Sequence, residues 1–474
     1  MDTSAGRDAV AVGGWNGMIS VTTGPLREQV RGEVIEPKDE HYEAARRVFN
    51  AMIDRRPAVI VRAANAGDVI AAVAFARQND LPVAVRGGGH SAPGFGTWDD
   101  AVVIDLQRMR GVRVDPRSKT ARAEGGATWG DYNAATHAFG LASTGGIVST
   151  TGVGGLTLGG GIGYLARGLG LALDNLISAD VVTADGQFRI ASERENEDLF
   201  WAIRGGGGNF GVVTSFEFKL HPVKDIYGGP MFYDIRDARY VLELYRDYIK
   251  DAPEEMGCFP AFQIAPPLPF IPESRHGELH ALIVGCWSGP IEEGEKRFKP
   301  FRDVAAVVAE MVGPMPYPAL NSAFDALYPA GELQHYWKGN FVRELTDEAI
   351  AVHLEHGEKV PALETTMHIY PINGACHRVA PDATAFGHRD ASFATVIAGM
   401  WRDPNDNPKN IQWVRDYSDA ITPYSEAGGY INFMSEDDQG RTQANYGANY
   451  NRLLEVKRRY DPDNVFRANQ NIKP

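Results

Sequence analysis

RGGGHSAPGFGTWDDAVVIDL, residues 86–106, places three consecutive glycines directly before a histidine, His90. Glycine loses more conformational entropy on folding than any other residue, so a run of it needs a structural reason. The apolar residues 81–85 just before it are typical of a short buried strand. A strand that leads into glycines predicts a loop whose adjacent N–H groups can hold an anion such as a phosphate. The alternative is a tight turn that carries a surface histidine, and this stretch alone does not separate the two.

Length, charge and cysteine content limit the class of protein. The 474 residues exceed the roughly 250–300 at which one core stops growing, so we expect two or more domains. A net charge of −14 argues against a nucleic-acid partner. Cys258, Cys286 and Cys376 show no CxxC or Cys/His spacing, so we expect neither a disulfide scaffold nor a metal site. The first twenty residues resemble neither a signal peptide nor a membrane span. We therefore expect residues 1–24 to be a loosely ordered tail on a soluble, cytoplasmic protein.

The pattern of apolar residues divides the chain at about Pro222. Before it, residues 68–77 have helical spacing between two apolar runs, which predicts a strand–helix–strand unit, and residues 212–220 alternate like a half-buried strand. After it the glycine clusters disappear, and residues 366–372 and 393–401 are typical of strands in a second unit. The last fifty residues return to glycine–aromatic sequence, which indicates that the C-terminal segment folds back onto a discontinuous first domain.

Four glycine clusters stand out, at residues 86–91, 124–126, 152–163 and 204–211. The last contains the pattern GxGxxG, but it follows a helix-like segment and leads into a strand, the reverse of the order that a dinucleotide fold requires. No GK[ST] follows any cluster, so a Walker loop is excluded as well. Several clusters in one domain predict a long polar ligand held against the backbone. The alternative is that the glycines only permit tight turns in a β-rich domain.

Four stretches together resemble the FAD-linked oxidases of the berberine bridge enzyme-like group, in the superfamily of vanillyl-alcohol oxidase and other PCMH-type FAD-binding proteins. They are residues 86–106, GVGGLTLGGGIGYLARGLGLALDNL at 152–176, DLFWAIRGGGGNFGVVT at 198–214 and NYGANYNRLLEVKRRYDPDNVFRANQNI at 445–472. The resemblance covers nearly the whole chain from about Gly32, and it is to the bacterial secondary-metabolism type of the group. It implies an α+β fold with a bilobed PCMH-type FAD-binding domain and a substrate domain built on a large antiparallel sheet covered by helices.

The resemblance implies three segments after the N-terminal tail of residues 1–24. Residues 25–224 form the FAD-binding domain, and residues 225–426 form the substrate-binding domain. Residues 427–474 are the berberine-bridge-type segment that returns to the FAD-binding domain.

The resemblance also answers the question of the glycines before His90. It implies that they cradle the FAD pyrophosphate and that His90 is bonded covalently to the 8α-methyl group of the flavin. Many relatives attach the flavin a second time through a cysteine, but Val148 stands at that position, so we expect one FAD per chain, covalent through His90 only. The cofactor contacts implied by the resemblance are Arg86, Gly87, Gly88, Gly89, His90, Ser91, Gly94, Val148, Thr151, Gly152, Gly154, Gly155, Gly159, Gly160, Gly161, Gly163, Asn209, Gly211, Val212, Asn432, Tyr446 and Asn449.

The identity of the catalytic base is not decided by the sequence. Plant relatives carry a tyrosine where this chain has Phe433, which cannot take a proton. Thr366, His368 and Tyr370 share one face of a predicted strand and are expected to face the substrate side of the flavin. Each candidate for the base also fits a packing role; the candidates are Tyr430, Tyr446, Tyr450, His368, Tyr370 and, more weakly, Glu364.

Thr151 replaces a valine or leucine that gates dioxygen access in relatives. A threonine here resembles a bacterial polyketide-tailoring member that oxygenates its substrate through a flavin oxide. The alternative is that threonine simply replaces an isosteric valine.

We therefore interpret the sequence as an FAD-dependent oxidase that takes a hydride from a small organic substrate and is reoxidised by dioxygen to give hydrogen peroxide. The alternatives are an internal flavin oxygenase and a non-catalytic flavin-carrying binding protein. Aromatic residues at Tyr328, Tyr336 and Trp337 suggest a flat or sugar-like ligand, although core packing explains them equally well. The sequence leaves the oligomeric state open.

Overall fold

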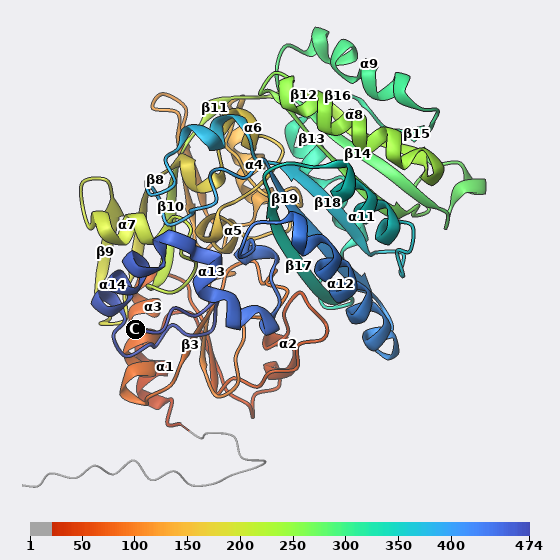
Figure 1. Ribbon diagram of the computed structural model, residues 1–474. Coiled ribbons are helices and arrows are strands. Elements are labelled where there is room, and N and C mark those ends of the chain that lie inside the picture. The colour runs from red at the N-terminus through yellow and green to blue at the C-terminus, as the bar shows by residue number, and fades with distance from the viewer. Residues whose placement is uncertain (1–20) are drawn as a thin grey trace, which may run out of the picture.

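A computed structural model describes residues 21–474 of the chain (Figure 1). Three main β-sheets lie among helices, as expected for the α+β class. The predicted N-terminal tail spans residues 1–24, of which 1–20 lie outside the described residues. No helix in residues 21–474 is long and apolar enough to cross a membrane.

The first sheet consists of β1 (Glu33–Ile35), β2 (Val59–Arg62), β3 (Val83–Arg86) and β4 (Val102–Asp105), with helix α3 (Ala66–Gln78) between β2 and β3. The strand order is β1-β2-β4-β3, and β2, β4 and β3 are parallel. Helix α3 begins where the side chain of Asn65 accepts a hydrogen bond from the N–H of Asp68 at 3.1 Å. The predicted strand–helix–strand unit is confirmed, and β3 leads directly into the glycines before His90.

The second sheet consists of β5 (Val112–Asp115), β6 (Thr120–Glu124), β8 (Leu176–Val182), β9 (Phe188–Ser192) and β10 (Val212–Lys219). It is antiparallel in the order β5-β6-β10-β8-β9. Helix α7 (Glu197–Ile203) precedes the glycine cluster at 204–211, and β10 follows it. This helix-then-strand order confirms that the GxGxxG pattern is not a dinucleotide motif.

The third sheet has eight antiparallel strands: β12 (Asp225–Asp234), β13 (Met256–Ile264), β14 (Leu279–Trp287), β15 (Val307–Glu310), β16 (Gly313–Pro316), β17 (Gln334–Val342), β18 (Thr366–Pro371) and β19 (Phe393–Trp401). The main order is β15-β12-β14-β13-β18-β19-β17, and β16 pairs with β12. The strands predicted at 366–372 and 393–401 are confirmed as β18 and β19. One face is covered by α8 (Ala238–Asp251), α9 (Gly294–Val304), α11 (Asp347–Gly357) and α12 (Asn407–Ile421) (Figure 1).

Alternation along β18 separates two environments. Met367 and Ile369 point into the core beneath the helices. Thr366, His368 and Tyr370 lie on the opposite face, which meets the first part of the chain. The sheet therefore has a helix-covered face and a face available to a site.

The remaining α-helices and strands connect or flank the sheets. They are α1 (Gly24–Gln29), α2 (Tyr42–Ala45), α4 (Trp129–His137), β7 (Leu141–Ala142), α5 (Val153–Gly159), α6 (Ala166–Leu169), β11 (His221–Pro222), α10 (Tyr317–Ser322), α13 (Thr442–Tyr446) and α14 (Tyr450–Tyr460). The three cysteines, Cys258, Cys286 and Cys376, are buried and free. Among residues 21–474, no group of three or more His, Cys, Asp or Glu side chains is placed to hold a metal ion.

The C-terminal segment returns to the first part of the chain, as the sequence indicates (Figure 1). Helix α14 packs against α7, and the N–H of Val83 in β3 donates to the carbonyl of Val465 at 2.9 Å. A fully buried ion pair fixes this segment, because Lys457 Nζ donates to Asp461 at 2.6 Å and to the carbonyls of Asn209 and Phe466 at 2.9 Å each. Lys457 thus ties the C-terminal segment to the glycine cluster at 204–211.

We predict that Lys457→Ala destabilises the protein by about 3–5 kcal/mol, because it leaves the Asp461 carboxylate buried without its partner. Arg458→Ala is the matched control: the neighbouring side chain is exposed, so its removal should change the free energy of unfolding by about 0.5 kcal/mol or less. Urea unfolding of both variants and the parent measures the difference. Equal midpoints for all three proteins would show that the pair does not hold the segment.

Candidate functional site

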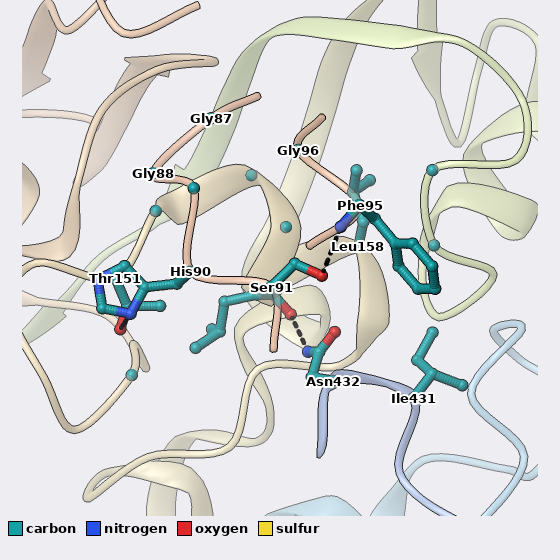
Figure 2. Close-up of a pocket in the computed structure, with 18 of the residues that line it drawn as sticks. Gly87, Gly88, His90, Ser91, Phe95, Gly96, Thr151, Leu158, Ile431 and Asn432 are labelled. Atoms are coloured by element: carbon teal, nitrogen blue, oxygen red, sulfur yellow. Dashed lines mark hydrogen bonds between the residues drawn. The ribbon is translucent and has the colours of Figure 1, made fainter. Parts of the chain in front are cut away.

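A cavity of about 340 Å³ lies between the glycine loops of the first part of the chain and the uncovered face of the eight-stranded sheet. One wall is made by the loop after β3, the loop before α5 and the cluster at 204–211. The other wall includes side chains of β17, β18 and β19, and the segment around Asn432 closes one end (Figure 2). The cavity thus joins segments that are far apart in the sequence.

Two glycine loops touch backbone to backbone at Gly88 and Gly152. A Cβ built on Gly88 would lie 2.4 Å from the Gly152 nitrogen, and one built on Gly152 would lie 2.4 Å from the Gly88 nitrogen. No side chain fits at either position. At Gly155 and Gly208, in contrast, an added Cβ would meet nothing within 4 Å, so these two residues leave open space along the cavity wall.

His90 lies at this contact, beside Thr151, the residue that precedes Gly152 (Figure 2). Thr150 Oγ1 is 3.0 Å from His90 Nε2, and Thr151 Oγ1 is 3.5 Å from Nδ1. The imidazole stacks on Phe49, with ring centroids 4.0 Å apart and an angle of 16° between the planes. Enclosure by the protein lowers the pKa of His90 to about 4, so the ring is neutral at physiological pH and one nitrogen keeps its lone pair.

Arg86 stabilises the loop that carries His90. Its guanidinium is buried and donates to the carbonyls of Gly96 at 3.1 Å, Ala45 at 2.5 Å and Arg46 at 3.4 Å. Burial lowers the pKa of Arg86, and the neighbouring Asp105 opposes that effect. Because its donors are used by backbone carbonyls, Arg86 holds the loop in place.

Tyr430 and Asn432 close the cavity from the C-terminal segment. The hydroxyl of Tyr430 accepts hydrogen bonds from the Gly161 N–H at 2.8 Å and from Asn432 Nδ2 at 3.0 Å. Asn432 also donates to the carbonyl of Leu156 at 3.0 Å. A Cβ at Gly159 would lie 2.2 Å from Asn432 Oδ1, which explains the glycine there. The hydroxyl of Tyr430 is therefore occupied by two donors.

Tyr446 and Gln470 line the cavity near the cluster at 204–211. Tyr446 donates to the carbonyl of Gly206 at 3.2 Å, and Asn209 bonds the same carbonyl at 2.9 Å and that of Gln470 at 3.1 Å. Both side-chain polar atoms of Gln470, Nε2 and Oε1, are buried and without a protein partner. A buried amide with free donor and acceptor atoms fits a polar ligand in the cavity. Together with the open faces of the glycines, it fits the long, polar FAD molecule.

The structure brings most of the predicted residues to this cavity. Those that line it are Arg86, Gly87, Gly88, Gly89, His90, Ser91, Val148, Thr151, Gly152, Gly154, Gly155, Gly211, His368, Tyr370, Tyr430, Asn432 and Tyr446. Those that do not line it are Gly94, Gly159, Gly160, Gly161, Gly163, Asn209, Val212, Asn449, Tyr450 and Glu364.

The second group has other contacts. Gly94 faces Ile53, where a Cβ would lie 2.6 Å from the nearest side-chain atom. Val212 belongs to a hydrophobic core. Asn449 donates to the carbonyls of residues 381, 384 and 385, and Glu364 accepts from Arg402 at 2.8 Å.

Sequence reasoning missed Phe49 and Gln470. No local pattern marks Phe49, which reaches His90 from another loop, whereas Gln470 lies inside the recognised C-terminal stretch. Of the three aromatic residues noted earlier, Tyr328 and Trp337 line the cavity. Tyr336 points away from it and bonds Asp437 at 2.5 Å.

Comparison with known families and proteins shows what the chain is similar to. Residues 57–192 match the family described as FAD binding domain, and residues 429–473 match the family described as berberine and berberine like. An FAD-linked oxidoreductase of Dictyostelium discoideum is 34% identical over 453 residues, which cover 94% of this chain and 96% of the relative. The (R)-6-hydroxynicotine oxidase of Paenarthrobacter nicotinovorans is 32% identical over 464 residues, which cover 94% of this chain and 97% of the relative.

Solved structures agree with this placement. The crystal structure of 6-hydroxy-D-nicotine oxidase from Arthrobacter nicotinovorans superposes with a TM-score of 0.85 at 27% identity, over 96% of this chain and 100% of that one. Glucooligosaccharide oxidase from Acremonium strictum, which carries a 6-S-cysteinyl, 8α-N1-histidyl FAD, shares the fold with a TM-score of 0.81 at 23% identity, over 95% and 98% of the two chains. The expected fold class is confirmed, and the chain belongs to the berberine bridge enzyme-like family of FAD-linked oxidoreductases.

Proposed function

We propose that the protein is an oxidase that holds one FAD through a single covalent bond to His90, takes a hydride from a small organic substrate and reduces dioxygen to hydrogen peroxide. When bound, FAD supplies the redox chemistry, and the protein orients and tunes it. The observation that carries this proposal is the position of the His90 imidazole in the cavity, at the contact of the two glycine loops and fixed by Phe49 and Thr150. Because relatives are oxidoreductases and oxidases, a non-catalytic flavin carrier is set aside.

His90 has the properties of an attaching nucleophile. Its low pKa leaves a ring nitrogen unprotonated, while the stacking on Phe49 and the hydroxyl of Thr150 fix the plane of the ring. The histidyl linkage of the Acremonium strictum oxidase supports the same role here.

A single attachment is supported by Val148, which lines the cavity where many relatives have a cysteine. The cysteines of this chain are buried in other parts of the structure, and burial raises their pKa values, so none is a reactive thiolate near His90.

We expect the yellow colour of the purified protein to remain with the pellet after acid precipitation, and the intact mass to exceed that of the polypeptide by one FAD. His90→Ala should release the flavin into the supernatant or lose it during purification, because the bonding nitrogen is gone. His41→Ala, at an exposed histidine, is the control and should keep the flavin attached. Complete release of flavin from the unmutated protein would refute the covalent bond.

Val148→Cys should allow a second attachment, because it introduces a thiol into the cavity wall next to the His90 contact. The readout is the peptide map of the flavin, which should then contain both His90 and residue 148. Ile147→Cys, one residue earlier on the same wall, tests the register and should leave attachment through His90 alone. A map that is identical for both cysteine variants would count against the assigned position.

An oxygenase is the second candidate, and the hydroxyl of Thr151 beside His90 is the observation that favours it. A hydroxyl can hydrogen-bond an oxygen species, whereas the isosteric valine can only shape the pocket.

We expect the parent and Thr151→Val to return to the same visible spectrum after one cycle of photochemical reduction and reoxidation in air, and to release equal amounts of hydrogen peroxide. This result follows if Thr151 serves to position His90 and shape the cavity. A spectrum that differs from ordinary oxidised flavin in the parent alone would support the oxygenase.

A further inference from the structure

Tyr370 and His368 form a hydrogen-bonded pair on the sheet wall of the cavity. They lie two residues apart on the same face of β18, and the hydroxyl of Tyr370 is within hydrogen-bonding distance of His368 Nδ1. Phe259 packs against both, with ring centroids 4.9 Å from His368 and 4.8 Å from Tyr370. The pair is therefore held rigidly with its polar atoms at the cavity.

Two other tyrosines, Tyr430 and Tyr446, line the cavity from the C-terminal segment, but their hydroxyl groups make different hydrogen bonds. The hydroxyl of Tyr430 already accepts two hydrogen bonds, and that of Tyr446 donates to a backbone carbonyl. The side chains of Tyr370 and His368 make no other hydrogen bond with the described residues. Among the candidates for the base that line the cavity, only Tyr370 bonds a side chain that can take up its proton, the imidazole of His368.

The wall around the pair is uncharged. Tyr328, Trp337 and Phe433 supply aromatic surface there, and among the described residues that line the cavity no Asp, Glu or Lys occurs. The one arginine, Arg86, belongs to the opposite wall and bonds backbone carbonyls. A charged group buried against this wall would lose its hydration without gaining a partner, so an uncharged group is favoured.

The resting pair is uncharged as well. Burial lowers the pKa of His368 to about 3. Burial also raises the pKa of Tyr370 well above its usual value, and the neighbouring Tyr328 and Tyr430 add to that effect. At neutral pH the phenol of Tyr370 therefore keeps its proton, and the unprotonated Nδ1 of His368 accepts the hydrogen bond from it.

We propose that Tyr370 and His368 act together as the proton acceptor for an uncharged aromatic substrate that carries an alcohol group, with Tyr370 in contact with the substrate hydroxyl and His368 acting through Tyr370. This proposal rests on the proposed oxidase function. The substrate O–H bond breaks and its proton joins the oxygen of Tyr370, while the original Tyr370 proton moves to Nδ1 of His368. The carbinol C–H bond breaks with its electron pair, which leaves as hydride to FAD as the two-electron oxidant, and the C=O bond forms.

Binding of a matched series tests the substrate class without turnover. The probes are 2-naphthylmethanol, 2-naphthoate and 2-naphthylmethylammonium, titrated into the flavin-loaded protein by calorimetry. We expect the alcohol to bind at least about tenfold more tightly than either ion, because the wall offers no countercharge. Tyr370→Phe should weaken binding of the alcohol about tenfold. Equal affinity for an ion, no binding of the alcohol, or unchanged binding by Tyr370→Phe would overturn the proposal.

A second pair in the same chain provides the control. Tyr417 and His353 are also buried, with the Tyr417 hydroxyl 2.7 Å from His353 Nδ1, but they lie between α11 and α12 and do not line the cavity. Tyr417→Phe removes the same kind of hydroxyl and should leave binding of the alcohol unchanged. A loss of binding equal to that of Tyr370→Phe would assign the effect to fold stability and refute a role at the site.

His368→Gln separates hydrogen bonding from proton acceptance, because glutamine can accept a bond from Tyr370 but is not basic. We expect the dissociation constant of 2-naphthylmethanol to change less than about threefold, while anaerobic bleaching of the flavin by the alcohol slows by about 10²–10⁴-fold. An unchanged bleaching rate, or no bleaching in the parent, would overturn the relay. Bleaching by dithionite and peroxide release in air test the oxidase function separately, so failure of one proposal is distinguishable from failure of the other.

Discussion

The backbone contact between Gly88 and Gly152 is the constraint on which the site depends. The two loops leave no room for a Cβ on either side, so they approach closely enough for His90 to reach Thr150 and Thr151. The second loop is fixed in turn by the Trp129 N–H, which donates to the carbonyl of Thr151 at 2.9 Å. A methyl group at either glycine would push the loops apart and move the imidazole away from its two hydroxyl partners.

A buried asparagine links this contact to the sheet wall. Asn50 Nδ2 donates to the carbonyl of Ala92 at 2.6 Å and to that of His335 at 2.9 Å, while its Oδ1 accepts from the His335 N–H at 3.0 Å. The loop that carries His90 and the start of β17 are therefore joined through one side chain. Because Phe49 precedes Asn50, the same short segment supplies the ring on which His90 stacks.

The uncharged character of the sheet wall follows from strand alternation. On β17, Trp337 faces the cavity, whereas Tyr336 and Lys338 face the other way. Lys338 is neutralised there by Asp437 at 2.9 Å and Asp438 at 2.7 Å. The charges that hold the C-terminal segment against the sheet are thus kept outside the cavity, and the inner face retains the aromatic residues and the Tyr370–His368 pair.

The features that depend on near neighbours in the chain could be predicted from the amino-acid pattern alone. Helix α3 and strands β10, β18 and β19 follow from periodicity, and the shared face of Thr366, His368 and Tyr370 follows from alternation. Which of the predicted residues line the cavity depends instead on long-range packing. Gly94 packs on Ile53, the hydroxyls of Tyr430 and Tyr446 are used by the protein, and Phe49 arrives from a separate loop. These differences arise because a side chain's free hydrogen-bonding capacity is set by groups distant in sequence, which local patterns do not encode.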